Sequence, residues 1–391
     1  MKTRKSKRLK RNIRNFFLLT IFAVLATFAG WFLQRKENLK TRKVEINYKV
    51  VDTKKEYKTN LVMVGDALMH MAVNNTYKAG NTYNFEGMFK YIKPIVENYD
   101  LAYYNQETIL GGVELGLSGY PQFNSPQEVG NSFVSTGFNL VSLATNHSMD
   151  NYYRTNGKSI ENSVNFWKKY SDKVIAAGSY LSESDRKEVI IKEIHGIKYA
   201  LLSYTEQTNG ISVPSGKEYL CNVYSKEKVK NDIERYRDKV DLLMVAMHWG
   251  EEYTTNLTTF QKETAKYLAS LGVNIIIGCH PHVIQPMDFI DNTLVIYSLG
   301  NFVSNQDTVQ KLTGLMASCV IKKIEYHGKT TVTLEDVGAE FIYTNKNNRY
   351  IVYPYSELND NILSGYKRYY QEYKNVINRY TDKITVKGVE V

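Results

Sequence analysis

Cysteine is scarce in this chain of 391 residues, and its scarcity argues against two kinds of site. The three cysteines, Cys221, Cys279 and Cys319, lie far apart, and no two of them form a CxxC motif. An odd, sparse set provides neither a disulfide framework nor a thiolate zinc site. Cys279 stands beside His280, but the simpler role for it is that of a small buried hydrophobic residue.

The sequence also lacks low-complexity tracts, internal repeats and a Gly-rich phosphate loop. Excess positive charge is missing from most of the chain as well. The first 43 residues carry 13 Lys/Arg and one acid, which accounts for more than the whole net charge of +10 and leaves −2 for the remainder. A nucleic-acid-binding body is therefore not expected.

The N-terminal region has the pattern of a membrane anchor. Residues 2–14 contain eight Lys/Arg and no acid, and residues 15–34 contain no charged side chain. An apolar run of this length approaches the roughly 20 residues that span a bilayer. The basic arm, 1–14, should stay in the cytoplasm, so that everything after the anchor at 15–34 lies outside a cell membrane crossed once.

The alternative for this region is a cleaved signal peptide, with Thr27-Phe28-Ala29 as a mediocre cleavage site. The apolar stretch is longer than a typical signal-peptide core, which favours an uncleaved anchor. Residues 35–58 form a charged neck; its lysines could hold a polyanion, but a solvated linker is the simpler interpretation.

From Thr59 onward the pattern predicts an α/β fold in which short apolar strands alternate with helices. The predicted strands are 61–64, 101–104, 140–143, 242–247, 273–277 and 294–297, with hairpins at 189–202 and 317–335. The predicted helices are 87–98, 128–137, 156–170, 225–238, 258–271 and 360–380. The main domain is expected over 59–344, followed by a Tyr-rich helical tail over 345–391.

Each of several strands leads into a side chain that can bind a metal ion. The set consists of Asp66, Glu107, Asn146, His248, His280 and His282. In sheets built from alternating strands and helices, function gathers at the carboxyl ends of the strands. Oxygen and imidazole donors without thiolate suit Zn²⁺, Mn²⁺ or Fe, and more than five ligands suit two ions better than one. Singly, Asp66 could cap a helix, Asn146 could form a turn and His248 could be a core histidine.

The segment Gly278-Cys279-His280-Pro281-His282-Val283 is central to this prediction. On extended backbone, imidazoles at i and i+2 point to the same side, and the proline between them should hold its neighbour extended. Two turn histidines without a function are the alternative.

Taken together, the motifs resemble those of the CapA/PgsA family of capsule or poly-γ-glutamate synthesis proteins, whose domain is related to calcineurin-like metallophosphatases. The resemblance covers about residues 59–305. It is carried by Gly65-Asp66, Asn105-Gln106-Glu107, Ala144–Asp150, His248–Glu251, Gly278–His282 and Tyr297–Phe302. It implies a metallophosphatase-like layered sheet sandwich with flanking helices, preceded by one transmembrane helix.

The resemblance also implies roles for individual residues. Asp66 and His282 would hold one metal ion, Glu107 would bridge, and Asn146, His248 and His280 would hold a second. His147 would act as general acid beside Asp150. The chain departs from the phosphatase pattern because Leu68 stands where a histidine ligand belongs, so His70 is a possible additional ligand, and because Glu107 replaces an aspartate.

The expected function is that of a membrane-anchored, extracytoplasmic component of poly-γ-glutamate capsule synthesis or export. One or two divalent ions would act on the anionic polymer, with other capsule synthesis subunits as partners. Tyr120, Asn124 and Asn301 are the predicted substrate-binding residues, although the 119–124 segment could be an ordinary turn. The alternatives are a non-catalytic metal-containing scaffold and a cell-envelope metallophosphoesterase.

Overall fold

The computed structural model describes residues 2–40 and 53–389, which fall into two compact units divided after Thr53. The N-terminal unit contains helix α1, Lys2–Lys40. Among the described residues, one helix, over Arg4–Glu37, is long and apolar enough to cross a membrane, although a signal sequence would pass the same test. Of the charged neck expected over 35–58, residues 41–52 lie outside the described part.

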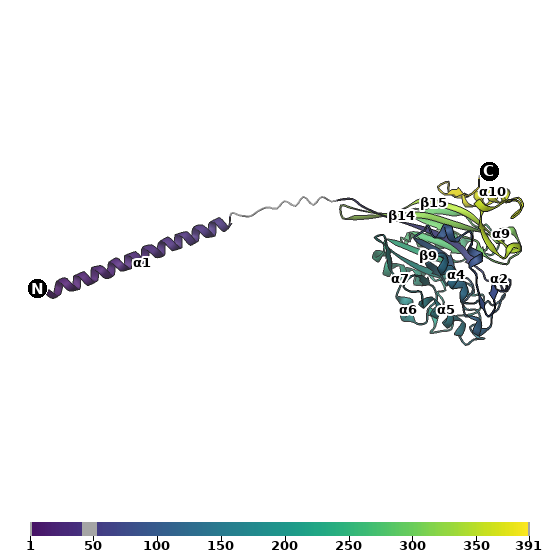
Figure 1. The fold of residues 1–391 in the computed structure, drawn as a ribbon, viewed down its shortest axis with the longest axis horizontal. Coiled ribbons are helices and arrows are strands. Elements are labelled where there is room, and N and C mark those ends of the chain that lie inside the picture. The colour runs from purple at the N-terminus through teal and green to yellow at the C-terminus, as the bar shows by residue number, and fades with distance from the viewer. Residues whose placement is uncertain (1, 41–52, 390–391) are drawn as a thin grey trace. The chain divides into compact units, whose positions relative to one another are not determined.

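The second unit is built on two sheets (Figure 1). In the described part of the chain, the larger sheet has the strand order β16-β15-β14-β1-β4-β5-β6, with β13 also paired to β1 and β17 to β15. Its strands are β1 (Lys55–Ala67), β4 (Leu101–Asn105), β5 (Leu140–Ser142), β6 (Ile175–Ala177), β13 (Asn301–Val303), β14 (Thr313–Tyr326), β15 (Lys329–Asn345), β16 (Ile351–Pro354) and β17 (Thr385–Lys387). Strands β1, β4, β5 and β6 run parallel to one another.

The smaller sheet has the strand order β11-β12-β10-β9-β8-β7. Its strands are β7 (Lys192–Ile194), β8 (Ile197–Thr205), β9 (Leu242–His248), β10 (Ile275–Cys279), β11 (Met287–Ile290) and β12 (Thr293–Ile296). Strands β8, β9, β10 and β12 are parallel, so their carboxyl ends share one edge. A two-stranded hairpin, β2 (Lys78–Ala79) and β3 (Thr82–Tyr83), stands apart from both sheets.

The hydrophobic core lies in three layers, and strand alternation determines which side chains enter each layer. Leu61 and Met63 of β1 point into the core between the two sheets, whereas Val62 and Val64 point to the outer face of the larger sheet. The third layer covers the outer face of the smaller sheet. The expected layered α/β sheet sandwich with flanking helices is therefore confirmed.

Helices cover the outer faces and one end of this sandwich. On the larger sheet these are α4 (Glu128–Thr136) and α5 (Lys158–Lys168); on the smaller sheet they are α7 (Lys226–Tyr236) and α8 (Thr259–Ser270). Helix α10 (Tyr366–Ile377) lies near β15 (Figure 1). Its buried Tyr370 and Tyr373 pack beside Phe341 of that strand. The shorter helices are α2 (Met71–Thr76), α3 (Lys93–Val96), α6 (Glu183–Lys187) and α9 (Val309–Leu312).

The structure differs from the predicted elements in three places. The helix predicted over 87–98 is a 3₁₀ turn, Glu86–Phe89, followed by the single-turn α3, because Pro94 is accommodated only in the first turn of a helix and α3 therefore begins at Lys93. The apolar run 189–191 is not a strand; β7 begins at Lys192, and Val189 and Ile190 line a pocket instead. The segment 345–391 contains the predicted helix but also gives β16 and β17 to the larger sheet.

Strand β1 changes partners immediately before Asp66. It pairs with β14 as far as Met63 opposite Ala317, and then with β13, where Asp66 lies opposite Asn301. Gly65 permits this change, because a Cβ there would lie 1.8 Å from the carbonyl oxygen of Gly300. The same carbonyl accepts a hydrogen bond from the Asp66 amide at 3.0 Å, which fixes the backbone of Asp66.

Candidate metal centre

The carboxyl ends of strands from both sheets meet at one place in the second unit. Asp66 lies near the end of β1 and Glu107 lies just beyond β4, while His248 ends β9 and His280 follows β10. All of these side chains are buried. The site is therefore built on the central parallel strands, where backbone positions are well determined by ladder hydrogen bonds.

One group of candidate ligands consists of Asp66, Glu107 and His282, whose ligand atoms all lie within 4.8 Å of one another. His282 Nδ1 is 3.3 Å from Asp66 Oδ2, and His282 Nε2 is 3.5 Å from Glu107 Oε1. The three residues offer two carboxylates and one imidazole, a donor set suited to a divalent transition-metal ion.

A second group gathers around His248. Its Nε2 atom lies 2.8 Å from Asn146 Oδ1, 3.2 Å from His280 Nδ1 and 3.8 Å from Glu107 Oε1. Glu107 thus lies within reach of both groups, which is the position a bridging carboxylate would occupy. The structure brings together all six side chains that the sequence proposed as ligands.

Glu107 provides the test of whether a cation fits here. Both of its carboxylate oxygens are buried and have no hydrogen-bond partner. Burial, with the Asp66 carboxylate nearby, raises the pKa of Glu107 well above its usual value, although His282 opposes the shift. A buried carboxylate that accepts no hydrogen bond costs free energy, which the contact with His282 offsets only in part and a bound cation would compensate. The residues present therefore fit a divalent metal ion.

The two histidines of the second group are poised as neutral ligands. Burial lowers the pKa of His248 well below its usual value and lowers that of His280 to about 4, and in both cases neighbouring histidines add to the effect. A neutral imidazole keeps a lone pair free for a metal ion.

The backbone of the His-Pro-His segment differs from the prediction. His280 and His282 have φ values of 98° and 57°, so neither is on extended backbone. The expectation that the proline holds its neighbour extended was wrong, because β10 ends at Cys279 and the chain turns sharply beyond it. The rings nevertheless converge, with centroids 6.1 Å apart. Unusual backbone conformations of this kind are concentrated at functional sites.

His147 and Asp150 form a hydrogen-bonded pair beside the two groups. His147 Nδ1 lies 2.7 Å from Asp150 Oδ2, which also accepts a hydrogen bond from the Phe123 amide at 2.6 Å. Phe123 meets the His147 ring edge-on at 4.8 Å. If Nδ1 carries the proton donated to Asp150, Nε2 is left as the atom available to a substrate.

The remaining predicted residues take different places. His70 lies on a cleft wall with Nδ1 between the Leu68 carbonyl and the Asn305 amide, and it does not belong to the Asp66–Glu107–His282 group. Tyr120 is 82% exposed and lines the same cleft, so it is available to a ligand.

Two predicted substrate-binding residues are fully buried and support other parts of the structure. Asn124 holds its own loop by donating to the carbonyls of Gly112 and Gly116. Asn301 lies behind His282, with its Oδ1 atom 2.9 Å from His282 Nδ1. Asn301 thus positions a candidate ligand, and neither side chain lines the cleft.

Sequence reasoning missed two residues at this site. Asn105 lies between the groups, with Nδ2 2.7 Å from Asp66 Oδ1 and 3.3 Å from His248 Nδ1. Its place at the end of β4 was the available signal. Tyr253 stacks on His282 at 5.9 Å with φ of 66°, and nothing in the sequence marks that conformation.

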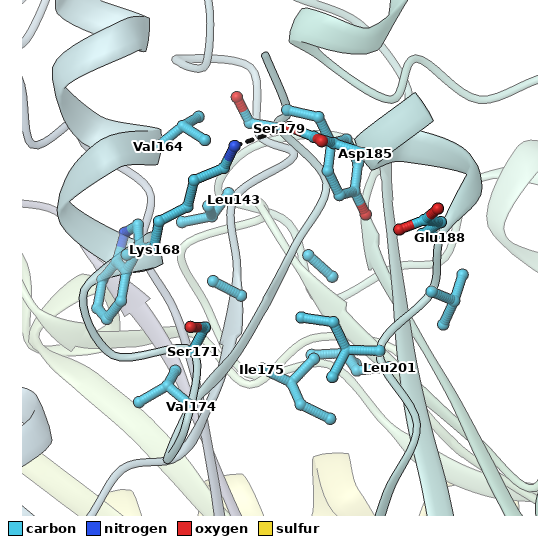
Figure 2. Close-up of a pocket in the computed structure, with 16 residues that line it drawn as sticks. Leu143, Val164, Lys168, Ser171, Val174, Ile175, Ser179, Asp185, Glu188 and Leu201 are labelled. Carbon is cyan, nitrogen blue, oxygen red and sulfur yellow. Dashed lines mark hydrogen bonds and ion pairs between the residues drawn. The ribbon is translucent and has the colours of Figure 1, made fainter. Parts of the chain in front are cut away.

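The cleft over these groups has a volume of about 810 Å³ and is mostly polar. His147, Asp150 and His282 form part of its lining, together with Tyr120, Tyr253 and Lys311. A second pocket, of about 250 Å³, lies between α5 and β6 (Figure 2). Its lining is largely apolar, but it also includes Glu188 and the Lys168–Asp185 ion pair, at 2.7 Å. None of the predicted site residues belongs to it.

Together, these features define a two-sheet α/β protein with a candidate metal centre at the strand ends. The chain belongs to the family described as bacterial capsule synthesis protein PGA_cap, whose model matches residues 60–306. The resemblance carried by the sequence motifs is therefore confirmed.

Two curated relatives carry related names. The chain is 26% identical over 297 residues to the capsule biosynthesis protein CapA of Bacillus anthracis, covering 74% of this chain and 68% of that protein. It is 25% identical over 273 residues to the PGA biosynthesis protein CapA of Bacillus subtilis, covering 66% and 67% respectively.

Solved structures with a similar fold include the calcineurin-like phosphoesterase YfkN of Bacillus subtilis, with a TM-score of 0.43 and 11% identity, covering 82% of this chain and 98% of that one. Another is the NAD nucleotidase NadN of Haemophilus influenzae, with a TM-score of 0.45 and 9% identity. That match covers 86% of this chain, which spans 58% of the length of NadN.

Proposed function

We propose that this protein is a membrane-anchored component of poly-γ-glutamate capsule synthesis that cleaves or transfers γ-glutamyl chains at a divalent metal centre outside the cytoplasm. The observation that carries the proposal is Glu107, whose two buried carboxylate oxygens accept no hydrogen bond and lie within reach of both groups of ligand atoms. Family membership supports the capsule context.

Asp66, Glu107 and His282 would hold one ion of the Mn, Zn or Fe type, and Asn146, His248 and His280 would hold a second. A bound divalent ion supplies Lewis-acid chemistry, polarising a carbonyl oxygen and lowering the pKa of water towards about 7. Asn105 and Asn301 keep Asp66, His248 and His282 in place through their hydrogen bonds.

His147 is the group that handles a proton. Asp150 accepts the Nδ1 proton of His147, and the protonated ring would donate its second proton, from Nε2, to the leaving amine nitrogen as the amide bond breaks. Burial raises the pKa of Asp150, against the opposing hydrogen bonds from His147 and Phe123. Asp150 would thus orient His147 without itself touching the substrate.

The test uses the full chain in detergent, loaded with Mn²⁺ and supplied with γ-glutamyl oligomers. Changing His147 to Asn should lower kcat by at least about 100-fold, because a general acid contributes roughly that much or more, while metal content stays at the parental level. Product release is followed by mass spectrometry, and metal content by elemental analysis.

The matched variant for this test is Asp150→Asn, which should also keep its metal and lose activity through a mispositioned His147. Cleavage of phosphodiesters but not of γ-glutamyl oligomers would replace the proposal with a cell-envelope phosphoesterase. Bound metal without turnover of either substrate would favour a scaffold that grips the polymer for partner subunits.

The proposed orientation has its own test. The basic flank of α1 should keep the N-terminus in the cytoplasm and place residues 54–391 outside. Protease added to wall-stripped intact cells should therefore digest an epitope fused at the C-terminus and spare one fused at the N-terminus. Protection of the C-terminal epitope would contradict the orientation, and its release into the medium would indicate cleavage after the apolar run.

A further inference from the structure

Lys311 has an unusual position on the wall of the cleft. It belongs to the short helix α9, and its ammonium lies over the ring of Tyr253, 4.4 Å from the centroid. Tyr253 in turn stacks on His282, with 5.9 Å between centroids and 28° between the planes. The three side chains therefore form a continuous stack that begins at a candidate metal ligand and ends at a positive charge.

This stack is held from several sides. The Tyr253 amide donates to the Pro281 carbonyl at 2.8 Å, and its hydroxyl accepts from Gln306 at 3.3 Å. The Lys311 carbonyl accepts a hydrogen bond from the Asn301 side chain at 2.7 Å. An ammonium over an aromatic face is attracted by the ring quadrupole, which fixes its place without using its hydrogen-bond donors.

The charge balance of the cleft gives Lys311 its significance. Among the described residues that line the cleft, the carboxylates are Asp150, Glu252 and Asp307, and Lys311 is the single lysine or arginine. Its ammonium contacts Asp307 Oδ1 at 2.8 Å, and the Asp307 side chain is 79% exposed. An ion pair with an exposed carboxylate is weak, so a carboxylate of a ligand can readily replace Asp307 at the Lys311 ammonium.

We propose that Lys311 is the residue that selects carboxylate-bearing substrates, and that Asp307 occupies its ammonium as a built-in competitor until a substrate carboxylate replaces it. The inference rests on the proposed function and deepens it. One side-chain carboxylate of an anionic chain would bind Lys311, and the neighbouring amide bond would then lie beside His282 and His147.

Binding by the full chain in detergent with saturating Mn²⁺ tests this inference. A γ-glutamyl oligomer is titrated and the affinity measured by calorimetry. Lys311→Met should weaken binding about tenfold, because a charge-assisted hydrogen bond is lost, and Lys311→Arg should restore it to within about threefold of the parent. Asp307→Asn should strengthen binding by about three- to tenfold, because the competing carboxylate is removed.

A second ligand separates recognition of the ligand's charge from effects of the substitution that do not depend on that charge. An oligomer of the same length with its carboxylates converted to primary amides should bind the parent weakly and should be indifferent to Lys311→Met. Metal content should match the parent in every variant, since Lys311 and Asp307 do not belong to the ligand groups.

The outcomes distinguish this inference from the proposed function. Lys311-dependent binding without turnover would support the inference and contradict the catalytic proposal. Turnover and binding that are unchanged in both Lys311→Met and Asp307→Asn would overturn the inference and leave the catalytic proposal standing. Failure of the metal-loaded parent to bind the γ-glutamyl oligomer would overturn both.

Discussion

Glutamine in place of Glu107 should yield a folded protein that has lost at least half of its bound metal and all measurable turnover. Glu107 is the carboxylate shared by the two groups of ligand atoms, and an amide cannot neutralise two cations. Elemental analysis of the parent and variant, purified side by side, measures the loss.

For the same variant we expect the order of thermal stability, parent against variant, to reverse when metal is added. Without metal, the parent carries a buried carboxylate that accepts no hydrogen bond, and its contact with His282 does not offset the burial. In Glu107→Gln, His282 keeps Asp66 as its ion-pair partner, so the variant should unfold at the same or a higher temperature. With metal at about 100 times its dissociation constant, the parent should gain about 2.7 kcal/mol and the variant much less. Glu263→Gln, at an exposed position of α8, is the control and should behave as the parent. A metal-dependent gain as large in Glu107→Gln as in the parent would contradict the site.

Alanine at Gly65 should destabilise the second unit severely. The new Cβ would lie 1.8 Å from the Gly300 carbonyl oxygen and 2.8 Å from its carbonyl carbon, and both are backbone atoms that cannot rotate away. Strand β13 must then move from β1, which breaks the hydrogen bond that fixes Asp66. We expect a loss of about 3–5 kcal/mol in the free energy of unfolding, or no folded product.

Gly87→Ala is the matched control, because its Cβ would meet only a tyrosine side chain at 3.6 Å, an ordinary contact distance. Urea unfolding followed by tryptophan fluorescence compares the two variants. Destabilisation of Gly65→Ala by less than about 1 kcal/mol would contradict the prediction, because it would show that β13 can move away from residue 65 at little cost. If Gly65→Ala folds at all, its metal content should be low, since the clash is adjacent to Asp66.

Much of the fold could be predicted because its strands are buried on both faces. Runs such as 61–64, 242–247 and 294–297 are continuously apolar and end at polar residues, so both the strands and the edge where they converge can be inferred. The helix over 87–98 was predicted wrongly because hydrophobic spacing takes no account of Pro94, which confines the start of the α-helix to Lys93.

The candidate site was predictable for the residues that end strands and unpredictable for those that reach it from loops. Asp66 and His248 follow directly from the strand pattern. The conformations of His280 and His282 do not, because positive φ at a histidine results from the tertiary structure around it. Tyr253 and Lys311 are 58 residues apart and meet only because the loop with Tyr253 packs on His282 and the short helix α9 places Lys311 over Tyr253.

The ligand groups draw on both sheets of the sandwich. Asp66 and Glu107 lie at the ends of strands of the larger sheet, and His248, His280 and His282 lie at the ends of strands of the smaller one. A cation bound by residues of both sheets would link the two sheets directly. Sliding of one sheet over the other would then be opposed at this edge by coordination bonds as well as by apolar contacts. Removing the metal with a chelator should therefore weaken the contact between the two sheets at this edge before it affects other parts of the sandwich. Amide hydrogen exchange should rise at the ends of β1 and β9 before it rises at their starts.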